Sequence, residues 1–185
     1  MRERAMPSRA ADDRKLRELI LYILQRSQDD PNMGATKLNK VLFRADFGSY
    51  LHLGDAITWH PYFKLENGPA PRHLIDIRRG MMSDGLVRIT KVDVGADKPM
   101  DRWEALRPPD LSIFTPEQLA FVDGVLEAMS DQTGTRAADD THLMVGWRLA
   151  GMREDIPYQT ALLADRASPA DIDRGRQLAR EHGWA

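Results

Sequence analysis

Apolar residues near the start of the chain recur with the period of an α-helix. In the stretch 14–26 they fall at i, i+3, i+4, i+7 and i+8, which predicts a helix with one apolar face. The residues of that face are Leu16, Leu19, Ile20, Ile23 and Leu24. Residues 36–52 carry two apolar stripes, so we expect a second helix that is buried on most sides and central in the fold. Thr36 can cap its start, and Gly54 can end it.

The middle of the chain has a different pattern. Residues 57–65 are rich in β-branched and aromatic residues, and their proline limits them to an edge strand or an extended segment. Residues 71–85 are typical of a short helix with Pro71 in its first turn. Strands are predicted over 86–94 and 101–106, joined as a hairpin. A helix followed by a hairpin is the pattern of a winged helix.

The last part of the chain is again helical in pattern. Thr115 and Gln118 form a capping box at the start of one helix, and residues 135–149 favour another. A final amphipathic helix is expected from Ser168 to about Gly183. The expected fold class is therefore mainly α, within α+β. We expect a compact helical domain with a small central β-hairpin and edge-strand element that is winged-helix-like in the middle.

Length and composition favour one cytoplasmic domain. The chain has 185 residues, and we expect a disordered N-terminal arm over 1–12 and a single domain over 13–185. Cysteine is absent, which excludes disulfides, thiol catalysis and cysteine-ligated zinc and suits a reducing compartment. No apolar run approaches the ~20 residues that span a bilayer, so no membrane is expected as a partner.

The charges are unevenly spread along the chain. Residues 1–110 carry 19 Lys and Arg against 16 Asp and Glu, a net of +3, whereas residues 111–185 carry 7 against 12, a net of −5. A dedicated nucleic-acid binder would concentrate basic residues on one face, and the acidic part would repel phosphate. Nucleic acid is therefore not the expected partner, and a protein partner fits this balance better.

Residues typical of catalysis do not form a pattern. The five histidines lack the spacing of metal ligands, and no HExxH, GxSxG, Walker A or GxGxxG motif occurs. Asp139 and Asp140 lie near His142 and could hold a metal, but a solvated helix start accounts for them more simply. We therefore expect no catalytic residue, no metal site and no cofactor, and we do not expect an enzyme.

Residues 64–73, KLENGPAPRH, form an unusually stiff turn. Gly68 lets the chain turn, while Pro69 and Pro71 fix φ and remove two hydrogen-bond donors. The turn would deliver Arg72 at a set angle, and a rigid exposed edge binds a partner with less ordering cost. The alternative is that the turn merely joins a strand to a helix inside the core. These two hypotheses do not exclude one another.

Three blocks of the chain resemble one family in the same order. They read KLNKVLFRADFGSYLHLGDAIT, then YFKLENGPAPRHL, then GWRL with IPYQTALL, and together they span about residues 36–163. They resemble the Panacea domain, the SocA-like antitoxin domain of bacterial and phage toxin–antitoxin pairs. Two departures stand out. Arg44 replaces the family's usual aromatic residue, and Glu66-Asn67 replaces a common Pro-Tyr pair.

The resemblance implies a bacterial or prophage antitoxin. Such a protein would neutralise a cognate toxin encoded by the adjacent gene through direct binding, without catalysis. The candidate partner-binding residues are Asp46, Tyr50, Lys64, Glu66, Asn67, Gly68, Pro69 and Arg72. The sequence leaves open the identity of the toxin, the binding surface, the oligomeric state and any autoregulation through DNA.

Two alternative functions and two structural hypotheses complete these expectations. A winged-helix DNA-binding regulator would use Arg72, Arg78 and Arg79, and a weaker alternative places a hydrolase or nucleotide site around Asp46, Lys64 and Glu66. Trp147 is expected to be largely buried against the second helix. A carboxylate such as Asp46 could hold Arg72 in a buried ion pair.

Overall fold

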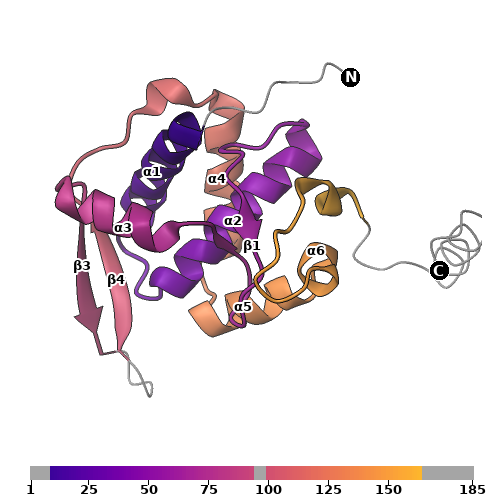
Figure 1. Ribbon diagram of the computed structural model, residues 1–185. Coiled ribbons are helices and arrows are strands. Elements are labelled where there is room, and N and C mark those ends of the chain that lie inside the picture. The colour runs from indigo at the N-terminus through magenta and orange to yellow at the C-terminus, as the bar shows by residue number, and fades with distance from the viewer. Residues whose placement is uncertain (1–8, 94–98, 164–185) are drawn as a thin grey trace, which may run out of the picture.

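The computed structural model describes residues 9–93 and 99–163, and it is mainly helical with two small antiparallel strand pairs (Figure 1). The expected fold class is confirmed. The elements are α1 Arg9–Arg26, α2 Ala35–Leu53, β1 Tyr62–Phe63, β2 Ala70–Pro71, α3 Leu74–Ser83, β3 Val87–Val92, β4 Met100–Ala105, a 3₁₀ turn Leu111–Ile113, α4 Pro116–Ala128, α5 Gly134–His142, α6 Val145–Leu149 and a 3₁₀ turn Tyr158–Leu162.

Helix α2 lies at the centre of the fold, as its two apolar stripes predict. It contacts α1, α4, α5, β2, β4 and the 3₁₀ turn at 158–162. Its end at Gly54, where φ is 75°, is also confirmed. The predicted cap is wrong, because the helix starts at Ala35 after Gly34 and Thr36 lies inside its first turn. Gly34, the residue before the helix, instead forms an antiparallel bridge with Arg102 of β4.

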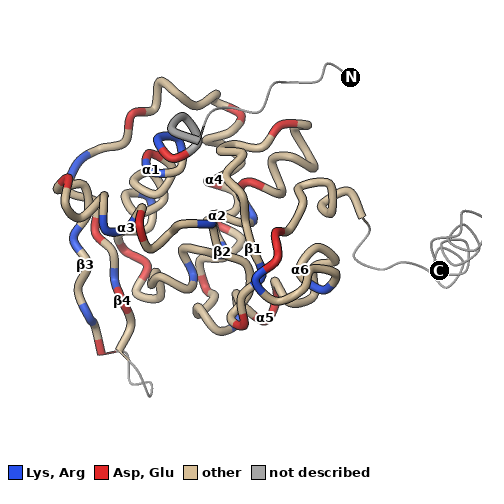
Figure 2. The backbone as a smooth tube through the Cα atoms, viewed as in Figure 1, with Lys and Arg blue, Asp and Glu red and all other residues tan. Residues whose placement is uncertain are grey.

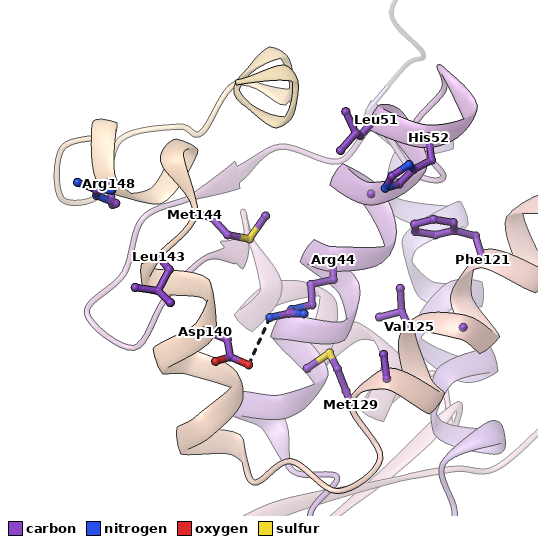
Figure 3. A pocket seen from close by; sticks show the side chains of 13 residues that line it. Arg44, Leu51, His52, Phe121, Val125, Met129, Asp140, Leu143, Met144 and Arg148 are labelled. Atoms are coloured by element: carbon purple, nitrogen blue, oxygen red, sulfur yellow. Dashed lines mark ion pairs between the residues drawn. The ribbon is translucent and has the colours of Figure 1, made fainter. Parts of the chain in front are cut away.

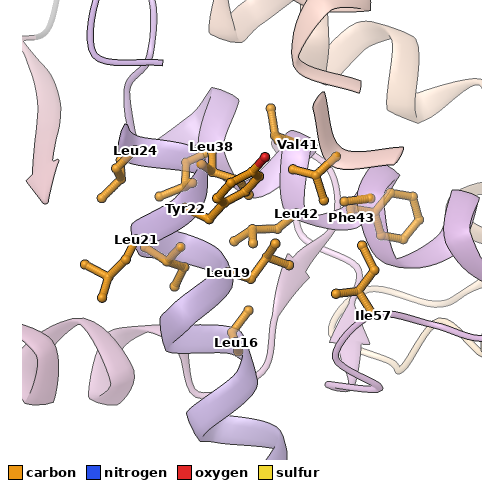
Figure 4. Close-up of a cluster of buried hydrophobic side chains, with 14 of the residues drawn as sticks. Leu16, Leu19, Leu21, Tyr22, Leu24, Leu38, Val41, Leu42, Phe43 and Ile57 are labelled. Carbon is orange, nitrogen blue, oxygen red and sulfur yellow. The ribbon is translucent and has the colours of Figure 1, made fainter. Parts of the chain in front are cut away.

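Helix α1 is more deeply enclosed than one apolar face suggests. From Glu18 to Leu24 every residue is buried, because α2 and α4 contact this helix together with α3 and β4. Side chains of α1 and α2 fill the space between the two helices (Figure 4). The buried Glu18 carboxylate accepts two kinds of hydrogen bond. Arg107 Nη1 donates to it at 2.9 Å, and the backbone N–H of Asp110 donates to it at 2.8 Å. The Arg107 hydrogen bonds, above all, lower the pKa of Glu18.

The two strand pairs differ in how well the sequence predicts them. The hairpin β3–β4 is confirmed, with Val87 opposite Ala105. The extended stretch 57–65 contains only the short β1, which pairs with β2. Pro71 lies in β2 rather than in a helix, and α3 begins at Leu74 because the preceding residue adopts φ of 56°. Helix α3 therefore precedes a hairpin, while a winged-helix arrangement stays a prediction.

The C-terminal helices confirm one prediction and correct another. Thr115 Oγ1 accepts from the Gln118 N–H at 3.2 Å and Gln118 Oε1 accepts from the Thr115 N–H at 3.2 Å, which completes the expected capping box of α4. The single helix expected over 135–149 is two helices, α5 and α6, with a break before Val145. The break lets Gly146 sit against Thr160, where an added Cβ would approach Oγ1 to 2.3 Å.

Two expectations concern the ends of the chain. Helix α1 already begins at Arg9, within the stretch expected as an arm. Residues 1–8, like the final helix predicted from Ser168 to Gly183, lie outside the described residues.

Candidate partner-binding surface

Asp46 holds the segment that leads into the stiff turn. Its side chain is 0% exposed. Oδ1 accepts from the Thr58 N–H at 2.6 Å, and Oδ2 accepts from the Thr58 hydroxyl at 2.6 Å and the Tyr62 hydroxyl at 2.8 Å. Burial raises the pKa of Asp46 in spite of these donors, and burial also raises the pKa of Tyr62 well above its usual value. A partner does not reach this carboxylate in the folded conformation.

Lys40 fastens the turn to α2. The residue is 1% exposed, and Nζ donates to the Pro69 carbonyl at 3.2 Å. Gly68 passes directly over it with φ of 91°, and a Cβ there would lie 2.6 Å from Nζ and 2.7 Å from Thr141 Oγ1. Only glycine fits such a backbone without strain. Burial lowers the pKa of Lys40 to about 8.

The remaining turn residues divide into engaged and exposed side chains. Lys64 Nζ donates to the Ala150 carbonyl at 2.9 Å. Glu66 and Asn67 are exposed at the tip, whereas Pro69 is buried with Gly68. The turn is therefore fixed to the core along one side and presents a short polar edge on the other. The buried side fits the hypothesis of a turn that joins elements within the core, while a role of the exposed edge in binding a partner stays a prediction.

Arg72 contacts the C-terminal part of the chain. Its Nε donates to the Asp155 carboxylate and its Nη2 to the Arg153 carbonyl at 2.8 Å. The guanidinium also lies 4.7 Å from the centre of the Phe63 ring. The hypothesis of an ion pair with Asp46 is wrong, because Asp46 is satisfied by hydroxyl and amide donors inside the core.

Two aromatic residues lie beside this region. Tyr50 is half-buried, with Trp59 at 5.6 Å between ring centres. Trp147 is partly buried and packs against the buried core cluster, while its packing against the second helix in particular stays a prediction. Its ring stacks on His142 at 4.1 Å, Nε1 donates to the Leu65 carbonyl at 3.2 Å, and Lys64 Nζ lies 4.1 Å above the ring. Trp147 therefore supports the turn from its outer side.

A groove opens on another side of α2 (Figure 3). Its volume is 870 Å³, and α2, α4, α5 and α6 all contribute to it. A second hollow of 290 Å³ shares three of its residues and continues toward the 3₁₀ turn at 158–162. The groove is lined by Arg44, Gly48, Leu51, His52, Phe121, Gly124, Val125, Ala128, Met129, Asp140, Leu143, Met144 and Arg148.

Large apolar side chains around this groove are exposed to solvent. Leu51 is 45% exposed and Leu143 is 70% exposed. Leu162 and Leu163, which line the second hollow, are exposed as well. Single exposed leucines are ordinary, but apolar residues gathered around a concave surface are typical of a protein-binding site. The sequence does not reveal this surface, because its residues come from three separate stretches and none of these stretches carries a binding motif of its own.

Arg44 is the polar group within the groove that lacks part of its hydrogen bonding. Its Nη2 lies 3.6 Å from Asp140, the contact drawn as a dashed line in Figure 3. Its Nε is buried and has no hydrogen-bond partner among the described residues. Asp140 also accepts from Gln132 Nε2 at 3.0 Å. A buried N–H without an acceptor is costly. The Arg44 side chain as a whole is 30% exposed, so an oxygen ligand can reach the part of the guanidinium that faces the groove.

Residues 9–93 and 99–163 contain no group of three or more His, Asp and Glu side chains that could hold a metal ion. No helix in these ranges is both long and apolar enough to cross a membrane.

Comparison with known families identifies the domain. The family model described as the SocA-like antitoxin, Panacea domain, matches residues 38–148. The chain belongs to this family. The matched part of the Panacea domain runs from α2 to α6 and contains Asp46, the stiff turn and most of the groove. The resemblance noted in the sequence is thereby confirmed, although its last block, IPYQTALL, lies beyond the matched residues. No curated protein and no solved structure matches the chain.

Proposed function

We propose that this protein is a cytoplasmic antitoxin that neutralises a cognate toxin by binding it directly. The toxin would be the product of an adjacent gene, and binding would hold it inactive without any catalytic step. The observation that carries the proposal is the groove with its rim of exposed leucines, found on a Panacea domain. Protein interfaces draw most of their affinity from a few apolar anchors in such depressions.

The candidate residues from the sequence take two roles in this proposal. Glu66 and Asn67 reach solvent at the tip of the turn and can contact the toxin directly. Asp46, Gly68 and Pro69 act inside the protein by fixing the position of the turn. Lys64, Arg72 and Tyr50 are partly exposed, so they can add contacts beside the turn while their present partners hold them in place.

The DNA-binding alternative gains no support from the arginines that it needs. Arg78 forms an ion pair with Asp101 at 3.0 Å, and Arg72 forms one with Asp155. Arg79 is exposed on α3. Lys and Arg alternate with Asp and Glu along the backbone (Figure 2). We therefore do not propose a regulator as a second function.

The hydrolase alternative fails on placement. Asp46 is enclosed in the core, Lys64 is directed to the Ala150 carbonyl, and Glu66 is exposed at the tip of the turn. Glu66 lines a hollow of 580 Å³ beside the turn, and neither Asp46 nor Lys64 is among the residues that line it.

Growth rescue and co-purification test the antitoxin proposal. The adjacent genes are cloned, and the one whose product arrests growth is expressed with and without this protein. We expect restored growth and a complex that stays together through size-exclusion chromatography. Persistent growth arrest with both proteins abundant and in solution would contradict the proposal.

A matched pair of variants tests whether the groove is the surface involved. Leu143→Glu changes a residue at the groove that is 70% exposed, and Ile75→Glu makes the same change on α3 at 66% exposure. Both are expected to fold, since neither residue belongs to the buried core. Only Leu143→Glu should lose rescue. Equal behaviour of the two variants would place the binding surface elsewhere.

A further inference from the structure

We infer that the groove takes a helical segment of the toxin that carries an apolar face and one acidic side chain, with the carboxylate placed against Arg44. The inference rests on the proposed function and specifies the chemistry of the partner. It combines the shape of the groove, the small residues in it and the unsatisfied Arg44 side chain.

The groove has the shape that a helix fills. On α2, Arg44, Gly48 and His52 follow one another at i, i+4 and i+8, and on α4, Gly124 and Ala128 are four apart. Rows spaced by four residues form the ridges and grooves into which another helix packs. The α2 row covers about two turns, or about 12 Å along the axis. This length suits about two turns of a bound amphipathic helix.

Gly124 leaves room for an incoming side chain. Beyond its own stretch of helix, a Cβ built at this residue meets no atom of the described residues within 4 Å, although the residue lies in the middle of α4. Gly48 differs, because a Cβ there would approach the Phe121 ring to 2.6 Å. Glycine at 48 therefore serves internal packing. At Gly124, by contrast, packing within the described residues does not require a glycine, and the free space beside it is part of the groove.

The charges in the groove favour an acidic partner. Arg44 and Arg148 line it with Asp140 as the carboxylate among its lining residues. Asp140 is 3.6 Å from Arg44 Nη2, too far for a hydrogen bond, and the buried Arg44 Nε lacks an acceptor. The Nε itself is enclosed, but the Arg44 side chain as a whole is 30% exposed, so a carboxylate from the partner can meet its outer guanidinium nitrogens and balance the second arginine. Arginine pairs with carboxylates through two parallel N–H donors, which also fixes the register of the bound segment.

Filling the groove provides the first test. Gly124→Leu places a side chain in the open space without an internal clash, and it replaces a helix-weakening residue. Arg79→Leu is the control, because it adds a leucine on α3, an element that contributes nothing to the groove. Both variants should melt no earlier than the unmodified protein. In titrations of the purified toxin, Gly124→Leu should lower affinity by about 30-fold or more, as loss of an interface anchor does. Unchanged affinity in a folded Gly124→Leu protein would overturn the inference.

Crosslinking identifies the occupant. A photoreactive amino acid is placed at Leu51 in the groove and, as a control, at Leu111, which has the same 45% exposure outside it. Mass spectrometry then locates the attached segment. We expect a toxin helix with apolar residues at i, i+3 or i+4 and i+7 and an Asp or Glu among them. Attachment to a loop, to a segment without a carboxylate, to a second copy of this protein or to its own residues 164–185 would overturn the inference.

The charge is tested on the same complex. Arg44→Gln should weaken binding by about 10-fold or more, and replacing the identified toxin carboxylate with its amide should add little further loss. Independent, additive losses would refute the pairing. These outcomes are separate from failure of the antitoxin proposal, in which the unmodified protein would form no complex with the toxin at all.

Discussion

Lys40→Met removes a buried charge while keeping most of the side-chain volume. The lysine is 1% exposed, its hydrogen bond is to the Pro69 carbonyl, and burial lowers its pKa from 10.5 to about 8. At neutral pH, burying the charged lysine therefore lowers the free energy of unfolding by about 3 kcal/mol. The lost hydrogen bond offsets about 1–2 kcal/mol of the gain. We therefore expect Lys40→Met to be more stable by about 1 kcal/mol near pH 7.

The pH dependence gives a sharper test than the absolute value. The unfolded chain keeps the Lys40 proton up to its ordinary pKa of 10.5, whereas the folded chain releases it at about 8. Between these values the unfolded state binds more protons, so stability rises with pH. Between about pH 7 and pH 9.5 the unmodified protein should gain about 2 kcal/mol relative to Lys40→Met.

Urea unfolding followed by tryptophan fluorescence measures this difference, since the chain has four tryptophans. The upper limit of about pH 9.5 avoids the buried tyrosines. Burial and the neighbouring Asp123 raise the pKa of Tyr22 to about 12, so its ionisation destabilises the fold only at higher pH. Parallel pH profiles for the two proteins would refute the reasoning. They would mean that the pKa of Lys40 in the folded protein stays close to that of the unfolded chain, as expected for a hydrated ammonium group.

Three further predictions concern the same region. Gly68→Ala should lower the free energy of unfolding by about 2–4 kcal/mol, and Gly54→Ala by about 1 kcal/mol. Both glycines have positive φ, but only a Cβ at Gly68 meets neighbouring atoms. Equal melting temperatures of the two variants would contradict the close approach at Gly68. Tyr62→Phe removes a donor to buried Asp46 and should cost about 1–3 kcal/mol in urea unfolding, and an unchanged midpoint would count against that bond. Arg72→Ala should cost no more than about 1 kcal/mol, because its ion pair is partly exposed; a loss of several kcal/mol by calorimetry would show a larger structural role.

The features that the sequence predicts well are local ones. The capping box of α4 depends on residues three apart, and the central place of α2 follows from apolar stripes within one segment. The hairpin β3–β4 likewise depends on two neighbouring strands and the turn between them. In each case the stabilising partners lie within a short stretch, so periodicity and turn chemistry are enough to find them.

The features that the sequence does not predict depend on contacts between distant segments. Lys40 looks like a solvent-facing lysine until Gly68 is brought across it, and Arg72 finds Asp155 83 residues away. The groove is harder still, because residues near 44, 124 and 143 become neighbours only after the helices pack. A single hint was present in Arg44, which stands where the family usually has an aromatic residue.

The closing of the core by Tyr158 has a consequence for how the protein is made. Its ring stacks on Phe47 at 4.4 Å, and its hydroxyl donates to the His60 carbonyl at 2.8 Å. On the ribosome, α2 emerges more than a hundred residues before this partner, so its aromatic side stays uncovered through most of translation. The domain therefore gains its finished surface late, and chains interrupted before Tyr158 expose an apolar helix that chaperones and proteases recognise.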